Sequence, residues 1–189
     1  MSGTQPINIF PQSPHYDPSI DLVAGDPSAP VCNRPALNGG TWLPITVRGD
    51  GASVDLVTVF VPERYGSRED RGGQSDRLAP GTRVRLRAET NSHIGMDLWL
   101  SSRPGYPTIG GAVGATQFQF TECRALLGRY TCWIAQVGIR EYDHAHYFVT
   151  AYCPLASQLV IQALGTAADE KEQSQQVAIL ATLRVEGPR

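Results

Sequence analysis

The chain has 189 residues, of which 41% are hydrophobic and 18% charged, and its formal net charge is −2. This length suits one domain with an appendage, and the hydrophobic content is sufficient for a packed core. The near-neutral charge gives no overall attraction to nucleic acids or acidic membranes. The apolar runs are far shorter than the roughly 20 residues that a membrane-spanning helix needs. The sequence near Met1 has none of the features of a signal peptide, which predicts a cytoplasmic location unless the cysteines pair or this methionine is artificial.

Residues 1–40 differ in composition from the rest of the chain. They contain seven prolines, and proline at this density prevents helices and central strands. The segment therefore predicts an extended arm, either a flexible tail or a docking element. Its few apolar side chains cannot form a core, whereas adding a strand to a partner's sheet would order it. We expect the partner contacts of this arm to come from Ile7, Ile9 and Phe10.

The folded part of the chain opens with signals for β-structure. Apolar runs at residues 41–47 and 53–61 flank a Gly-Asp-Gly turn and predict a hairpin. Apolar and polar residues alternate at 83–88 and 95–100, which predicts two further strands. The charged, glycine-bearing stretch at 63–77 predicts a loop.

The last third of the chain predicts a four-stranded meander followed by one helix. The strands are expected at residues 117–123, 130–139, 145–153 and 158–164, and the helix at 169–182. Thr166 or Asp169 can cap the helix, whose polar first half is expected to face solvent. The fold predicted for residues 41–189 is a single α+β domain, a twisted antiparallel sheet covered by this C-terminal helix and preceded by the extended proline-rich arm.

The order of these features resembles the PsbP-like fold, which includes extrinsic photosystem subunits, LpqN-type lipoproteins and DcrB-like domains. The features that match are the first strand after Gly39-Gly40, the VFVPE strand that ends at Pro62, and the ILATLRV sequence of the terminal helix. They span residues 40–185. The resemblance implies a non-catalytic accessory module that docks on larger assemblies or membrane-associated machinery, and members are typically extracytoplasmic. No functional residue can be carried over from it.

The four cysteines leave two redox states open. None forms a Cys-x-x-Cys motif, which argues against a structural zinc site. Cys123 and Cys132 lie symmetrically about residues 127–128, so a tight hairpin there would place them opposite each other on paired strands. The predicted disulfide is then Cys123–Cys132, with Cys32–Cys153 as the remaining pair, and it requires an oxidising compartment. The alternative is four buried thiols in a cytosolic protein.

His144 and His146 are the candidate metal ligands. Side chains at i and i+2 on a strand point to the same face, as some zinc and iron sites require. A third ligand could come from His93, Glu141 or Cys153, and the alternative is a polar hairpin turn. The sequence carries no motif for a serine or cysteine nucleophile, and its glycine-rich loop lacks the lysine of a P-loop. We therefore expect no catalysis and no cofactor.

Arg83, Arg85 and Arg87 form a basic stripe on one face of a strand. Such a row can engage phosphates or carboxylates, or it can prevent unwanted pairing of an edge strand. Nucleic acid is disfavoured because no stacking aromatic residues are interleaved with these arginines. Trp99 lies opposite the apolar face of its strand, either beneath a loop or helix or exposed at an interface. Lys171 is the only lysine, a bias that indicates a GC-rich bacterial genome.

These patterns together favour a non-catalytic accessory or structural subunit of a larger protein assembly, membrane-associated or not. It would dock through its N-terminal arm and through the sheet surface that carries the arginine stripe and Trp99. The alternative is a small-ligand or metal-binding protein, or even an enzyme, built around His144 and His146.

Overall fold

The computed structural model describes residues 25–34, 36–49, 52–71, 82–101, 105–107, 109, 115–141, 143–155 and 160–186. Its large sheet contains β3 (Tyr65–Arg71), β4 (Thr82–Ala88), β5 (Asn91–Ser101), β6 (Ala115–Leu127), β7 (Tyr130–Glu141), β8 (His144–Pro154) and β9 (Val160–Ala167). Its small sheet contains β1 (Gly40–Gly49), β2 (Ala52–Pro62) and β10 (Arg184–Glu186). Helix α1 spans Glu170–Leu180.

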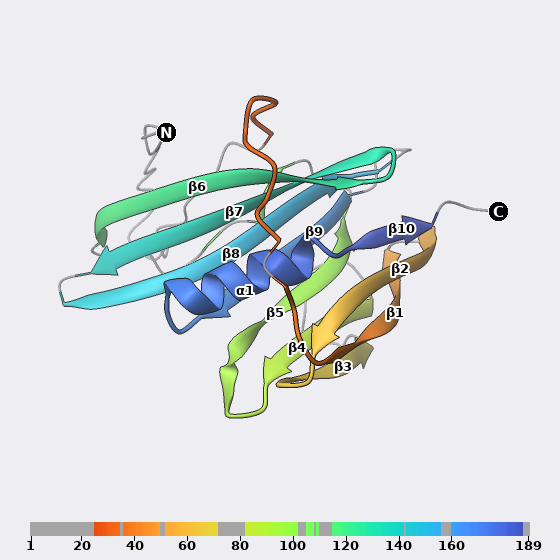
Figure 1. Cartoon of the computed structure of the whole chain (residues 1–189), viewed down its shortest axis with the longest axis horizontal. Helices are drawn as coiled ribbons and strands as arrows, with labels where there is room; N and C mark the ends of the chain where they lie inside the picture. Colours follow the sequence, from red (N-terminus) through yellow and green to blue (C-terminus); the bar gives the residue numbers. More distant parts are fainter. Residues whose placement is uncertain are drawn as a thin grey trace, which may run out of the picture.

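The large sheet is antiparallel, with its seven strands in the order β3-β4-β5-β9-β8-β7-β6 (Figure 1). The strands β6 to β9 are neighbours in chain order, as the predicted meander requires. Gly128 turns the chain between β6 and β7 with φ +67, a left-handed conformation that glycine adopts without steric cost. The small sheet has the order β1-β2-β10.

One face of the large sheet carries the main hydrophobic core, in which Leu98, Ile134 and Ile161 are fully buried. Helix α1 packs over the β7, β8 and β9 part of this face, and β1 of the small sheet packs over β4 and β5. Figure 1 shows the helix in front of the large sheet and the small sheet beside it. The face is therefore covered by two different elements.

The predicted α+β class, with a sheet covered by one helix, is wrong. The described residues contain ten strands in two sheets and a single helix of 11 residues. A helix is about 10–12 Å across, which is enough for about three strands spaced by about 4.8 Å. Helix α1 contacts that many strands of the large sheet, so the remainder of the face needs the small sheet as a second cover.

The loop predicted at residues 63–77 is also wrong in part, because β3 lies within it. This charged strand pairs with β4 from Tyr65↔Ala88 to Arg71↔Thr82. Its own sequence has little strand propensity, so pairing with β4 rather than local preference accounts for its conformation.

Helix α1 begins after Asp169, whose side chain accepts a hydrogen bond of 2.7 Å from the backbone N–H of Glu172. This confirms Asp169 as the capping residue. The prediction that the first half of the helix faces solvent is wrong for Glu172, Gln173 and Gln176, which are buried. The amide of Gln173 donates to two strand carbonyls, each at 2.9 Å, which satisfies a polar group that would otherwise be costly to bury. Among the described residues, no helix is long and apolar enough to cross a membrane.

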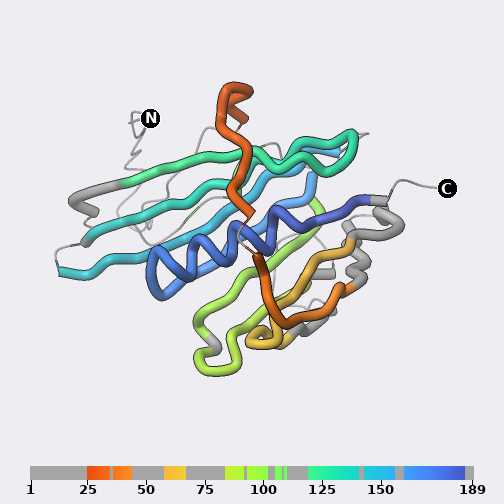
Figure 2. Tube along the Cα trace, in the orientation of Figure 1, coloured from red at the N-terminus to blue at the C-terminus, as the bar shows by residue number. Residues whose placement is uncertain are grey.

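Residues 25–34, which we call the crossing segment, pass over the edge of β6 on the way to the small sheet, as Figure 2 shows. On β6, Glu122 accepts the backbone N–H groups of Gly25 and Asp26 at 3.2 and 3.1 Å. Further along, Arg124 exchanges backbone hydrogen bonds of 2.7 and 2.8 Å with Pro30 and Cys32. The part of the predicted arm that the structure describes is therefore attached to the chain's own sheet.

Two disulfides join Cys32 to Cys123 and Cys132 to Cys153, so all four cysteines are paired. The predicted pairs, Cys123–Cys132 and Cys32–Cys153, are wrong. The β6–β7 turn lies one residue later than the predicted centre, which shifts the cross-strand register by two residues. Cys123 therefore lies opposite Ile134 rather than Cys132, and it bonds to Cys32 of the crossing segment. The register of β7 and β8, with Trp133 opposite Tyr152, places Cys132 against Cys153, with Cα atoms 4.1 Å apart.

Replacing Cys32 and Cys123 together with alanine should lower the free energy of unfolding by about 2–5 kcal/mol. The reason is that this disulfide closes a separation of 91 residues, against 21 for the other one, and a longer loop restricts the unfolded chain more. Urea unfolding followed by tryptophan fluorescence measures the difference. Dithiothreitol should lower the free energy of unfolding more for the wild type, which loses two disulfides, than for the double variant, which loses one. A wild type whose stability does not change with dithiothreitol would contradict both pairings.

Candidate functional site

The arginine stripe lies on an interior strand, because β4 is hydrogen-bonded to both β3 and β5. The prediction that these arginines prevent unwanted pairing of an edge strand is therefore wrong. The Nη2 atom of Arg87 lies 2.7 Å from Oδ1 of Asp97, and Nε of Arg85 lies 3.8 Å from the same oxygen. The structure does not describe the side chain of Arg83, nor the arm residues Ile7, Ile9 and Phe10. The two described arginines are engaged within their own sheet, so they do not make a ready docking stripe.

Trp99 is half-buried on the face of the large sheet opposite the main core. Its Nε1 atom donates to Oε1 of Gln162 at 3.2 Å, and the Gln162 amide donates to the carbonyl of Gly105 at 2.7 Å. Trp99 is thus tied through Gln162 to the segment that follows β5. The bond accounts for the indole N–H of Trp99, and the interface role of this half-buried side chain stays a prediction.

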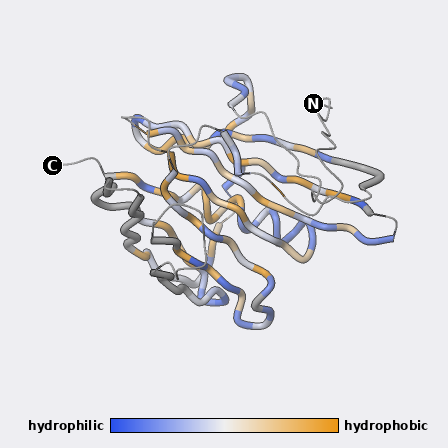
Figure 3. Tube along the Cα trace, turned by 180° about the vertical axis from the view of Figure 1, so that it is seen from behind, coloured by the Kyte–Doolittle hydropathy of each residue, from blue (hydrophilic) through white to orange (hydrophobic). Residues whose placement is uncertain are grey.

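The same face carries a second, smaller hydrophobic cluster around Tyr106, Ala135 and Val137, and Figure 3 views the molecule from this side. The Tyr106 hydroxyl donates to the Glu122 carboxylate. Burial and this carboxylate hold the pKa of Tyr106 well above its usual range, so the hydroxyl keeps the proton that it donates. Both polar groups serve the attachment of the N-terminal segment and the packing of this face.

His144 and His146 are exposed at the start of β8. Of the suggested third ligands, Cys153 is bonded to Cys132, and His93 is exposed on β5. Glu141 pairs in register with His144, but its side chain lies outside what the structure describes. Within the described parts of the chain, no three side chains of His, Cys, Asp or Glu are gathered so that they could hold a metal ion. The structure therefore brings no described third ligand to the histidine pair.

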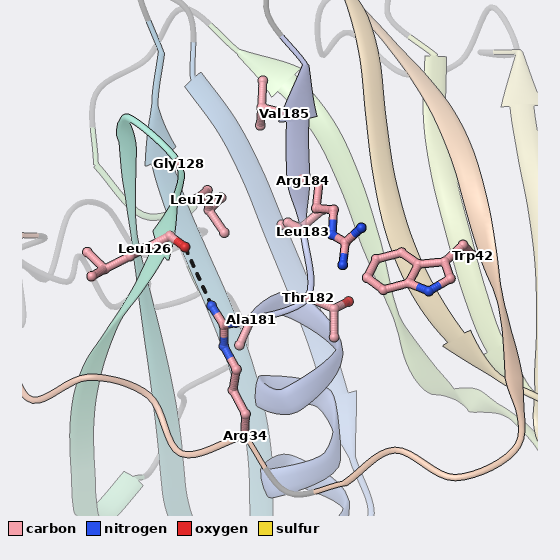
Figure 4. Close-up of a pocket in the computed structure, with 10 residues that line it drawn as sticks. All are labelled: Arg34, Trp42, Leu126, Leu127, Gly128, Ala181, Thr182, Leu183, Arg184 and Val185. Atoms are coloured by element: carbon pink, nitrogen blue, oxygen red, sulfur yellow. Dashed lines mark hydrogen bonds between the residues drawn. The ribbon is translucent and has the colours of Figure 1, made fainter.

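A groove of about 500 Å³ lies between the end of β6 and the small sheet. Residues 126–128 form one wall, to which Leu126 contributes its backbone rather than its side chain (Figure 4). Residues 181–185 form the floor, and Trp42 of β1 and Arg34 of the crossing segment complete the groove. The floor is the connection from α1 into β10. The groove therefore lies where the helix, the small sheet and the crossing segment meet.

The large hydrophobic side chains that are exposed among the described residues are Val31, Trp42 and Leu126, with 59%, 45% and 55% of their surfaces exposed. Trp42 presents its ring to the groove, whereas the Leu126 side chain points away from the groove and turns its backbone carbonyl toward Arg34 (Figure 4). Single exposed hydrophobic residues are ordinary on a protein surface, so the contacts that Trp42 makes are more informative than its exposure.

Two arginines add positive charge to the groove. The Arg184 guanidinium lies 4.1 Å from the centroid of the Trp42 ring, a cation–π contact. On the other side, Arg34 donates to the carbonyl of Leu126 at 3.5 Å, the dashed line of Figure 4. None of the ten lining residues is an aspartate or glutamate. The groove is therefore apolar and cationic together.

The position of the groove residues follows from contacts beneath them. Thr182 accepts the backbone N–H of Phe60 at 2.9 Å and donates to the carbonyl of Ile179 at 2.6 Å, which ties the helix end to β2. The Trp42 ring packs edge-to-face on Phe60, with centroids 5.7 Å apart. The exposed tryptophan is thus held in place rather than free to collapse onto the surface.

Sequence reasoning missed this groove because its residues come from four separate segments. Trp42, Arg34, Leu126 and Arg184 share no motif and no common spacing. One weak signal was present, since Leu126 stands directly before the predicted hairpin turn, where a large apolar side chain has little to pack against. The juxtaposition itself depends on the crossing segment and on the two-sheet topology.

No protein-family model matches the chain, and no curated protein matches it in sequence. The functional argument consequently depends on the geometry of the site. Within that geometry, the groove combines exposed apolar surface, held aromatic and arginine side chains, and an absence of lining carboxylates.

Replacing His144 and His146 together with glutamine should leave the free energy of unfolding within about 0.5 kcal/mol of the wild-type value, as for exposed positions generally. The matched control is Gln173→Ala, which should lose about 1–3 kcal/mol because a buried hydrogen-bond network loses its donor. Urea unfolding measures both. Stoichiometric zinc or iron in the purified wild type, lost in the double variant, would instead support the metal-binding alternative.

Proposed function

We propose that this chain is a non-catalytic accessory module that binds a protein partner through the groove between β6 and β10. The observation that carries the proposal is the exposed pair of Trp42 and Arg184, which are held against each other at the edge of the groove. Tryptophan and arginine are the residue types most enriched among interface hot spots, and they act best beside apolar surface that excludes water.

The PsbP-like resemblance supports the accessory role, because it implies a module that docks on a larger assembly. A stable interface buries at least about 1,000 Å² in total, which takes more residues than the ten that line the groove. Neighbouring surface is therefore part of the proposal. The proline-rich arm would add contacts through Ile7, Ile9 and Phe10, as the sequence predicts.

The proposal also includes an oxidising compartment. Its support is the pairing of all four cysteines, since disulfides persist outside the cytosol and are reduced within it. The typical location of PsbP-like proteins agrees with this. The thiol alternative, with four buried cysteines in a reducing compartment, would remove the link that anchors the crossing segment beside the groove.

A photoreactive phenylalanine derivative in place of Trp42 should cross-link a discrete partner in the native cell. The same amino acid at Glu89, exposed on the turn between β4 and β5, is the control and should not capture that partner. The partner is identified by mass spectrometry, purified, and its binding to the wild-type chain is measured by calorimetry. Capture of the same proteins from both positions, or from neither, would contradict the proposal.

Trp42→Ala should weaken the binding of that purified partner at least about tenfold, equivalent to about 1.4 kcal/mol. Trp42→Phe keeps an aromatic ring over which Arg184 can lie and should lose less. Thermal melting of both variants checks that the fold is intact. An unchanged dissociation constant for a folded Trp42→Ala variant would show that the groove does not bind the partner.

A further inference from the structure

We infer that the groove accepts an extended, acidic segment of the protein partner, which adds a strand to the outer edge of β10. The inference rests on the proposed function, because it names the chemistry of the partner for the same groove. It follows from three features of the described residues: an uncovered strand edge, an apolar wall and a pair of arginines.

The first feature is the unpaired outer edge of β10. In the small sheet β10 is an outer strand, paired with β2 through Arg184↔Thr58, Val185↔Val57 and Glu186↔Leu56. Along an antiparallel pair, successive residues direct their N–H and C=O groups alternately toward the partner strand and away from it. The outer side of β10 therefore directs backbone groups away from β2, and such an edge is a template for another strand.

By contrast, the chain covers the edge of β6, the strand on the opposite side of the groove. The chain covers β6 at Arg124 with its own segment, through backbone hydrogen bonds from Arg124 to Pro30 and from Cys32 to Arg124. The Cys32–Cys123 disulfide fixes that cover. Proteins commonly protect sheet edges in this way. The described residues provide no comparable strand for the outer side of β10.

The apolar wall fits a strand in this place. Figure 4 shows β10 between Trp42 on one side and the Leu126–Gly128 stretch on the other, so its outer side faces this stretch. Leu127 and Val185 supply apolar lining here, whereas the Leu126 side chain points away from β10. Side chains of an added strand would alternate, one set toward this apolar wall and the other toward solvent and the groove rim. An alternating apolar and polar segment therefore suits the groove.

The arginines of the groove indicate which polar side chains the added strand would carry. Arg34 and Arg184 flank the groove, and no lining residue carries a carboxylate. Guanidinium groups bind carboxylates through paired hydrogen bonds. The bond from Arg34 to the Leu126 carbonyl is long, at 3.5 Å, so a carboxylate would be a better acceptor. Glutamate or aspartate at alternate positions of the segment meets this requirement.

A polypeptide is favoured over a nucleic acid for two reasons. Strand addition uses backbone N–H and C=O groups, which a nucleic acid does not have in this arrangement. Single-stranded nucleic acids also require several stacking aromatics along a basic track, whereas this groove offers one exposed tryptophan.

The test uses a synthetic nine-residue peptide with capped ends, in which glutamate alternates with valine, and the full chain labelled with ¹⁵N. We expect the peptide to shift the amide resonances of Arg184 and Val185 and the indole resonance of Trp42. Arg34→Gln and Arg184→Gln should each weaken binding at least about fivefold, while Lys171→Gln, an exposed change on α1, should not.

Matched peptides separate the parts of the inference. Replacing glutamate with lysine should abolish the shifts if charge complementarity holds, and N-methylation of alternate peptide bonds should abolish them if the backbone pairs with β10. Equal binding by either peptide, or preferential binding of a thymidine oligonucleotide to the same residues, would overturn the inference.

Its failure can be distinguished from failure of the proposed function. A partner that cross-links at position 42, while the glutamate–valine peptide leaves Arg184 and Val185 unshifted, would mean that the groove binds a segment of another kind. The proposed function would then stand without the acidic strand. Absence of both the cross-link and the peptide shifts would overturn both.

Discussion

The core face of the seven-stranded sheet must be shielded from water, and no single element of the chain is wide enough to do it. Helix α1 shields the part over β7, β8 and β9, and the small sheet shields the part over β4 and β5. Thr182 joins these two covers, since its hydroxyl accepts from Phe60 of β2 and donates to Ile179 of the helix. The two-sheet architecture and the short strand β10 both follow from this division of the cover.

The groove is the place where the covers meet without closing. The crossing segment contributes Arg34, the small sheet contributes Trp42 and Arg184, and the large sheet contributes Leu126. The Cys32–Cys123 disulfide holds the crossing segment at the edge of β6 and so keeps its side of the groove in place. The groove is in this sense a product of the packing, because no local sequence element creates it.

Features that depend on residues close in the sequence could be predicted, whereas features that depend on contacts between distant segments could not. Alternation of apolar residues located the meander strands, and the Asp169 cap was readable because capping is a contact within one turn. The buried amide of Gln173 was missed because its acceptors lie on β7 and β8. The cysteine pairs were missed because one residue of turn position changes the register by two. The groove required four distant segments at once, beyond any spacing rule.

The central claim, that the groove around Trp42 is where a protein partner binds, is tested most directly by ¹⁹F NMR of the chain labelled with 5-fluorotryptophan. The chain has three tryptophans, and the indole N–H groups of the other two are bonded internally, Trp99 to Gln162 and Trp133 to Asp26. They serve as internal references. The account predicts that the cross-linked partner, added in purified form, shifts the Trp42 resonance and leaves the other two in place. A bound partner that shifts Trp99 or Trp133 and leaves Trp42 unchanged would contradict it.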